Sequence, residues 1–242
     1  WMQRSQRSFY NHALEYAVQR ANEMNQPLLV VFCLTEVFPE ANRRHYAFMV
    51  QGLRETRARL EARGVRMLVL RGTPEHGIPG LAENASLVVT DRGYLRLLRM
   101  WRSAVAGMIS CQMVQVEGDV VVPVQEASSK EEYAARTIRP RIQGLIEEYL
   151  HPLEMRPLRH DSLSLRVEYP NLSRELEVPV LPAANGEVGE VDWIRGGESE
   201  ASRLLDEFID YKLESFADLR NDPSREHLSN MSPYLHFGQI SP

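Results

Sequence analysis

Residues 228–241 have types and a spacing that suit the binding of an anion. Ser229 and Asn230 are small and polar, and an apolar, aromatic run begins shortly after them. Ser232 is predicted to be the N-cap of a helix and Pro233 its first residue, where a missing N–H costs nothing. The free N–H groups and the dipole of such a helix favour a phosphate beside them. An ordinary capped helix with a buried aromatic face explains the same residues.

Metal and disulfide chemistry have little support in this sequence. Cys33 and Cys111 are the only cysteines, and they lack the CxxC spacing typical of zinc ligands. Cys33 ends an apolar run and is expected to be a small core residue. No metal site is predicted, and the two thiols indicate a reducing, intracellular setting.

Composition is that of a soluble globular protein, with 43% hydrophobic and 25% charged residues. No apolar run approaches the roughly 20 residues that a membrane helix needs, and no secretory leader is recognisable. Residues 1–160 hold 21 Lys and Arg against 17 Asp and Glu, whereas residues 161–242 hold 7 against 16. Composition alone therefore does not predict a basic nucleic-acid groove in the second part.

The elements that must position any site alternate in hydrophobic period along the first half of the chain. Strands are predicted at residues 27–33, 65–70, 87–90 and 112–117. Helices are predicted at residues 8–24, 44–63 and 95–108, with another that follows the turn at residues 72–75. This order predicts a doubly wound parallel α/β sheet. Trp1 and Met2 are expected to be the tail of a further strand, so the chain is expected to lack residues at both ends.

Ligands of such a sheet bind at the carboxyl ends of its strands, which lead here into residues 34–41, 72–75 and 91–96. No GxGxxG or P-loop signature occurs at these ends. Asp91 is expected to cap the next helix rather than to bind a ligand. Arg4 and Arg7 are expected to be solvated at the surface, although contact with a ligand or with the linker stays open.

The second half of the chain lacks the regular alternation of strands and helices that is predicted for the first half. A capping box at Ser129–Glu132 predicts a helix that runs to about Leu150, with a kink at Pro140. Prolines then accumulate, and helical period returns only at residues 198–216. We therefore predict an α/β domain at 1–150, a linker at 151–197 and the start of a helical domain at 198–242.

Three single residues are predicted to be structural rather than chemical. His236 lies in an apolar helix and is expected to be a satisfied core histidine. Trp101 and Trp193 are expected to pack against their neighbours rather than to carry electrons.

Six stretches in order resemble one family, the DNA photolyases of the cryptochrome/photolyase group, and within it the class II cyclobutane-pyrimidine-dimer photolyases. These stretches are WMQRSQR at 1–7, VFCL at 31–34, EEYAARTIRP at 131–140, GGE at 196–198, RNDP at 220–223 and the segment 229–241. The resemblance spans nearly the whole chain. It implies an α/β antenna domain, a linker and the beginning of an all-helical domain that binds FAD in a folded, U-shaped form.

The resemblance also implies the activity. Such lyases bind a pyrimidine dimer that is flipped out of damaged DNA, and light-excited reduced FAD gives it an electron that splits the cyclobutane ring. Some relatives hold a deazaflavin or a folate as an antenna chromophore, and residues 34–41 and 91–96 are the natural candidates to contact it. The expected protein is a monomeric flavoprotein of DNA repair that lies in the cytoplasm, the nucleoid or the nucleus and not in a membrane.

Carried onto this sequence, the resemblance implies a set of cofactor contacts around the FAD diphosphate. The residues implied are Phe216, Leu228, Ser229, Asn230, Met231 and Ser232. Many relatives have a tyrosine where Phe216 stands, so one hydrogen bond to the cofactor is in doubt. Arg220 falls at a position that faces the DNA backbone, and a salt bridge to Asp218 or Asp222 is its alternative role.

No catalytic residue is expected in these 242 residues, because the residues that contact the dimer and relay electrons belong to a later part of the family's sequence. The chain alone is therefore expected to be inactive. Two other functions stay open. One is a cryptochrome-like FAD photoreceptor without repair activity, and the other is an isolated α/β ligand-binding module.

Overall fold

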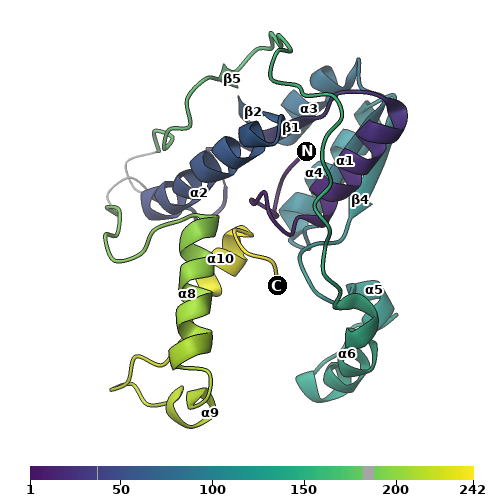
Figure 1. Ribbon diagram of the computed structural model, residues 1–242. Coiled ribbons are helices and arrows are strands. Elements are labelled where there is room, and N and C mark those ends of the chain that lie inside the picture. Colours follow the sequence, from purple (N-terminus) through teal and green to yellow (C-terminus); the bar gives the residue numbers. More distant parts are fainter. Residues whose placement is uncertain (37, 182–187) are drawn as a thin grey trace.

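The computed structural model describes residues 1–36, 38–181 and 188–242. An α/β part comes first, an extended segment crosses it, and a helical part follows (Figure 1). The α/β part contains α1 (His12–Met24), β1 (Leu29–Leu34), α2 (Arg43–Ala62), β2 (Arg66–Arg71), α3 (Pro74–Ala82), β3 (Leu87–Asp91), α4 (Arg96–Met108) and β4 (Gln112–Val116). Then come α5 (Val124–Ala127), α6 (Ala135–Tyr149), β5 (Leu172–Ser173), α8 (Glu198–Tyr211), α9 (Phe216–Leu219) and α10 (Ser232–Phe237).

The first two residues lie between two parallel strand pairs, β1–β2 and β3–β4. Met2 pairs in parallel with Phe32, and its N–H donates to the carbonyl of Val31 at 2.9 Å. On the other side, the backbone nitrogen of Trp1 donates to the carbonyl of Val89 at 2.7 Å. The predictions of a parallel sheet and of a strand tail at Trp1–Met2 are therefore confirmed.

Helices cover both faces of this sheet, as the nearly continuous apolar strands require. The larger hydrophobic cluster joins strand residues to Leu14 and Val18 of α1 and to Leu53 of α2. The cluster on the other face joins Cys33 and Leu70 to residues of α3 and α4. Cys33 is buried in this cluster, which confirms the prediction of a core cysteine, and burial raises the pKa of its thiol to about 12.

Two helix predictions in the first 150 residues need correction. The first helix begins at His12 instead of residue 8, because the side chain of Asn11 accepts the N–H of Leu14 at 3.0 Å and caps it there. The predicted helix after Ser129 is wrong at its start. Ser128 forms a turn instead: its hydroxyl donates to Glu132 at 2.8 Å and accepts the N–H of Lys130 at 3.3 Å. Only Ala135–Tyr149, with Pro140 inside it, continues as α6.

The segment predicted as a linker lies along the α/β part (Figure 1). Leu172 and Ser173 form β5, which extends the sheet antiparallel to β2 and was not predicted. Leu176 is buried in the larger hydrophobic cluster, and the N–H of Arg156 donates to Glu15 at 2.9 Å. Residues 182–187 of the predicted linker and Val37 of the predicted ligand loop lie outside the described residues.

The helical part packs onto α2 through a third cluster, which joins Phe48 to Ala201, Met231 and Tyr234. The predicted helix at 198–216 ends at Tyr211, and Phe216 starts the separate helix α9. Figure 1 places α9 and α10 at opposite ends of α8. Among the described residues, no helix has the length and apolarity that crossing a bilayer requires.

Candidate functional site

The helix predicted to bind an anion is α10, and it is short, with six residues. Ser232 is not its N-cap as predicted, because Ser232 is already the first helical residue and Met231 holds the cap position. Pro233 is consequently the second residue. Burial of Met231 in the cluster around Phe48 explains this start, since it anchors the chain one residue before the serine.

The residues before α10 carry groups suited to a phosphate. Asn230 has a left-handed backbone (φ 56°), a conformation that asparagine tolerates, and its side chain is exposed. Ser232 is also exposed, while the hydroxyl of Ser229 accepts the N–H of Met231 at 3.5 Å. Leu228, just before them, is exposed and apolar. Hydroxyl, amide and first-turn N–H donors without a carboxylate among them fit the diphosphate of FAD.

The other predicted contacts, Phe216 and Arg220, stack on each other in α9. The edge of Phe216 packs on Phe208, with centroids 5.2 Å apart, and the Arg220 guanidinium lies 5.5 Å from the Phe216 centroid. In the described residues Arg220 forms no ion pair with Asp218 or Asp222, so its alternative role is not observed. The structure does not bring Phe216 next to Ser232, because α9 and α10 lie at opposite ends of α8 (Figure 1).

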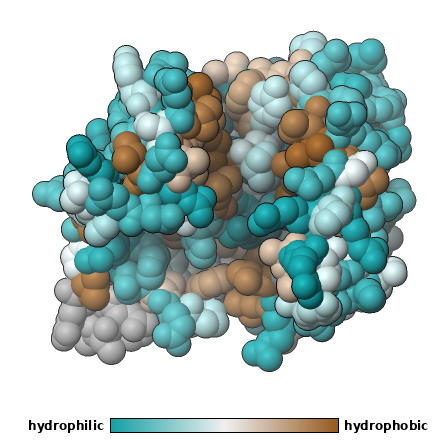
Figure 2. All heavy atoms as spheres, turned by 90° about the horizontal axis from the view of Figure 1, so that it is seen from below, coloured by the Kyte–Doolittle hydropathy of each residue, from teal (hydrophilic) through white to brown (hydrophobic). Residues whose placement is uncertain are grey.

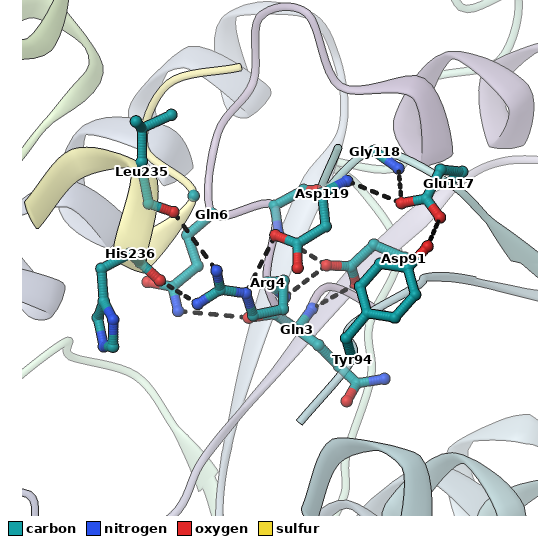
Figure 3. Close-up of polar contacts among 12 residues, drawn as sticks. Gln3, Arg4, Gln6, Asp91, Tyr94, Glu117, Gly118, Asp119, Leu235 and His236 are labelled. Carbon is teal, nitrogen blue, oxygen red and sulfur yellow. Dashed lines mark hydrogen bonds and ion pairs between the residues drawn. The ribbon is translucent and has the colours of Figure 1, made fainter. Parts of the chain in front are cut away.

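Asp91 at the end of β3 does not cap the next helix, which begins after Leu95 without a side-chain cap. Its buried carboxylate accepts three backbone N–H groups instead, those of Gln3 at 2.7 Å, Arg4 and Ser5 at 2.6 Å (Figure 3). Asp91 therefore fixes the turn that follows the central Trp1–Met2 strand.

The expectation of solvated arginines is also wrong. Arg4 pairs with Asp119 at 3.2 Å and donates to the carbonyls of Leu235, at 3.4 Å, and His236 (Figure 3). Arg7 is buried and donates to the carbonyls of Gly238 and Gly118. Both side chains therefore join the α/β part to the end of α10. Sequence reasoning missed this role because residues 3–8 show no period that marks them as buried.

Two of the three residues expected to pack in a core lie at the surface. His236 is exposed at the end of α10, although partial burial and the neighbouring Arg4 lower its pKa. Trp193 is 77% exposed, so its predicted packing is wrong. Trp101 packs edge-on against Phe38, with centroids 6.3 Å apart, which confirms that prediction.

A cavity of about 290 Å³ lies at the carboxyl ends of β1 and the Trp1–Met2 strand. Both predicted loops reach it, through Thr35 and Phe38 on one side and Leu95 on the other, and Phe237 of α10 closes part of it. On the face of the molecule shown in Figure 2, apolar atoms gather around a central hollow.

Polar groups in this cavity have unused hydrogen-bonding capacity. The side-chain oxygens of Gln3, Gln6 and Thr35 are buried there and have no partner among the described residues. Buried polar atoms are normally satisfied, so these three point to a ligand that donates hydrogen bonds. The aromatic rings of Phe38 and Trp101 add flat apolar walls. Gln3 and Gln6 belong to the stretch 1–7 quoted for the family resemblance, but no role was predicted for them because glutamine at such spacing carries no signal of its own.

Comparison with known proteins gives three kinds of match. The family model for DNA photolyase matches residues 1–158. The chain is 46% identical over its whole length to the deoxyribodipyrimidine photo-lyase of Methanothermobacter thermautotrophicus and covers 53% of that protein. It is 34% identical to the enzyme of the same name from Potorous tridactylus, again over its whole length, and covers 46% of it. The chain thus spans about half the length of the curated relatives it matches.

Two solved structures share the fold. One is the Synechocystis cryptochrome, with a TM-score of 0.70 and 19% identity over all of this chain and 52% of the cryptochrome. The other is an archaeal photolyase from Sulfolobus tokodaii with two FAD molecules, with a TM-score of 0.67 and 16% identity over 99% of this chain and 51% of that one. At such identities the likeness shows the fold alone.

Proposed function

The chain belongs to the DNA photolyase family, and on that premise we propose that it is part of a lyase that splits cyclobutane pyrimidine dimers in DNA with light. The observation that carries the proposal is the match of the whole chain to curated deoxyribodipyrimidine photo-lyases. The motifs at 131–140 and 229–241 favour the class II branch. The proposed protein acts as a monomer on damaged DNA inside the cell.

We propose the division into an antenna domain at 1–150, a linker at 151–197 and the start of the FAD-binding domain at 198–242. Two features support it. The described residues between α6 and α8 contain only the short strand β5. After them, α8 begins at Glu198 and packs with α10 onto α2 in a cluster of its own.

The proposed FAD site begins with the segment 228–232. The exposed Asn230 and Ser232 are placed to donate to the diphosphate, and the helix start adds its N–H groups. Phe216, in α9 and packed on Phe208 of α8, contributes an aromatic surface without the hydroxyl of a tyrosine. Light-driven electron donation to the dimer is the chemistry that reduced FAD supplies when bound. The residues of this chain bind and orient the cofactor.

We also propose that the cavity near Thr35 holds an antenna chromophore, a deazaflavin or a folate. The three unpartnered oxygens of Gln3, Gln6 and Thr35 support a heterocycle with N–H or O–H donors, and Phe38 and Trp101 support a planar one. For the DNA, we propose a backbone contact through the exposed guanidinium of Arg220, which is already held over Phe216.

The test uses the full-length gene product. We expect it to retain FAD on purification, seen as flavin absorbance, and to repair a dimer-containing oligonucleotide in light but not in darkness. The 242-residue chain by itself is expected to show no repair. Flavin binding without repair would favour a photoreceptor, and a protein that binds no flavin would contradict the proposal.

A pair of variants tests the cofactor segment. We expect Ser232→Ala to lower FAD affinity by about tenfold, because a hydrogen bond to a charged phosphate is lost. Ser224→Ala is the matched control, since Ser224 is an exposed serine that bonds to Asp222 outside the proposed site. Equal loss in both variants, or in neither, would count against the proposed contact.

A further inference from the structure

We propose that Arg7 is a positioning residue for the flavin site: it holds the carboxyl end of α10 and thereby fixes the segment 229–232. The inference rests on the proposed function, because it takes that segment as the site of the FAD diphosphate. It gives the α/β part a role in cofactor binding that is separate from any antenna chromophore.

The Arg7 guanidinium joins two parts of the molecule. Its side chain is buried, with the residue 2% exposed. Nη1 donates to the carbonyls of Gly238 at 3.1 Å and Ile240 at 3.4 Å, just after α10. Nη2 donates to the carbonyl of Gly118 at 2.9 Å and Nε to that of Tyr10 at 3.0 Å, both in the α/β part. A planar group with donors on several sides is required to reach all four.

The charge of Arg7 is held by these carbonyls rather than by an ion pair. Among the described residues, no carboxylate lies within ion-pair distance of it. Burial lowers the pKa of Arg7 to about 10, which still leaves the guanidinium charged at neutral pH. A buried cation is costly unless polar groups surround it. The carbonyls of Gly238 and Ile240 after α10, together with those of Tyr10 and Gly118, provide such groups.

Two neighbours hold the same end of α10. Arg4 donates to the carbonyls of Leu235 and His236, and its own charge pairs with Asp119 (Figure 3). Gly238 has a left-handed backbone (φ 66°), and a Cβ there would collide with the carbonyl oxygen of Arg4. The carboxyl end of α10 is thus in direct backbone contact with the loop that carries Arg7.

A helix transmits such a constraint to its other end. From Ser232 to Phe237, α10 is about 9 Å long, so fewer than two helical turns separate Gly238 from the segment 229–232. A displacement at Gly238 therefore displaces Ser232 and the residues before it. Arg7 has no described contact with the segment 229–232, so its effect on cofactor binding has to pass through α10.

The experiment compares Arg7→Lys with Arg63→Lys in the full-length gene product. Lysine keeps the charge, but one ammonium cannot reach Gly118 and Gly238 together. Arg63 is the matched control: it pairs with Glu15 at 2.7 Å and donates to the carbonyl of Ser8 at 3.1 Å, with no described contact to α10. We expect Arg7→Lys to weaken FAD binding by about tenfold or more, measured by fluorescence titration, and Arg63→Lys by less than about twofold.

A second readout needs no flavin. In the apoprotein, amide hydrogen exchange at residues 231–240 should accelerate in Arg7→Lys, while the amides of β1 and β2 keep their protection. Gly238→Ala should accelerate the same amides, and it serves in place of any Arg7 variant that fails to fold. Unchanged exchange and unchanged FAD affinity in a folded Arg7→Lys protein would overturn the inference. If the wild-type protein binds no FAD, but exchange at residues 231–240 still accelerates in Arg7→Lys, the proposed function alone would be refuted.

Discussion

The α/β part and the helical part bury their side chains in different ways. In the α/β part, α2 alone has eight buried residues, and four of the six residues of β2 are buried. In the helical part, α8 buries only Glu198 and Ala201. Ile209, Tyr211 and Leu213 are at least half exposed at its other end.

The buried residues of the helical part face α2 and the loop before α1. Gln239 fits beside Gly52, accepts the N–H of Gly197 at 2.7 Å and donates to the carbonyl of Phe48 at 3.4 Å. The hydroxyl of Tyr234 donates to the carbonyl of Arg195 at 2.6 Å. In the described residues the α/β part therefore acts as the template on which α8 and α10 are placed. Substitutions of the carboxylates of Asp91 and Glu198 test the contribution of each part to stability separately.

The largest effect is expected from Asp91, which stabilises the α/β part from within. Asp91→Ala removes the acceptor of three N–H groups, and we expect it to lower the free energy of unfolding by about 4 kcal/mol. Urea unfolding, followed by far-UV circular dichroism, measures this. Asp218→Ala on the exposed helix α9 is the control, with an expected change below about 0.5 kcal/mol. A small effect of Asp91→Ala would mean that the turn at residues 3–5 is not needed for the sheet.

Glu198 plays the corresponding role between the two parts. Its carboxylate accepts hydrogen bonds from the N–H groups of Ser8, at 2.7 Å, and Phe9, at 3.0 Å. It also accepts hydrogen bonds from the hydroxyl of Ser8 and the hydroxyl of Thr56. We expect Glu198→Ala to cost about 3 kcal/mol and to release α8 and α10 before the sheet. Hydrogen exchange resolved by segment distinguishes this from global unfolding.

Glu200→Ala is the matched control for Glu198, because Glu200 lies on the same turn of α8 but pairs with Arg203 at the surface. An exposed pair of this kind is worth about 0.5 kcal/mol. If Glu198→Ala exposed β1 and α8 to exchange equally, the two parts would unfold as one unit, and the proposed difference between them would be wrong.

The sequence predicted the sheet well because its strands are apolar on both faces and its helices are amphipathic over several turns. The four main strands lie within two residues of their predicted ends, and the largest difference is at the start of Leu29–Leu34, which was predicted at 27–33. Local pattern is sufficient for such elements, since their burial follows from the period alone. The strand β5 was missed because it has only two residues, which is too short for a hydrophobic period, and because its partner β2 is distant in the sequence.

The site was predictable only in part. Ser229 and Asn230 are recognisable because small polar residues before a proline signal a helix start, but the start itself was misplaced by the burial of Met231. Arg4 and Arg7 were expected in solvent, since an isolated arginine is normally exposed. Their partners include backbone carbonyls more than 200 residues away, in the case of Arg7 those of Gly238 and Ile240. Backbone acceptors have no sequence signature, so such contacts require the structure.

A substitution with a smaller expected effect separates the hydrogen bond of Tyr234 from the apolar packing that holds α10 on the α/β part. Tyr234→Phe keeps the ring against Phe48, 5.2 Å from centroid to centroid, and removes the hydrogen bond to Arg195. We expect a loss of about 1 kcal/mol in unfolding free energy. Tyr211→Phe is the control, because Tyr211 is 77% exposed and should change stability little. A loss as large as that of Glu198→Ala would show that the hydroxyl, rather than the apolar cluster, holds α10.

The smallest expected effect is a dependence on pH, which both parts share through one histidine each. Burial lowers the pKa of His12 in α1, with Arg7 as the next cause, and burial, Arg4 and His45 lower that of His236 in α10, while Asp119 acts in the opposite direction. Both groups favour the neutral form in the folded state, so the unfolded chain binds more protons below its ordinary pKa of 6.5. The two histidines therefore do not lower the free energy of unfolding above pH 6.5, and they lower it progressively as the pH falls below that value.

Urea midpoints at about pH 7.5 and pH 5.5 test this decline, which lies above the ordinary range of carboxylate titration. His236→Gln should remove the contribution of the helical part, so that acid no longer accelerates exchange at α10, whereas His12→Gln should leave that acceleration in place. His151→Gln, on an exposed histidine, is the control. Protonation of His236 adds a positive charge beside Arg4, whose guanidinium donates hydrogen bonds to the carbonyls of Leu235 and His236. If acid loosens α10 in the wild type but not in His236→Gln, the weak point of the helical part lies at its contact with the α/β template rather than inside α8.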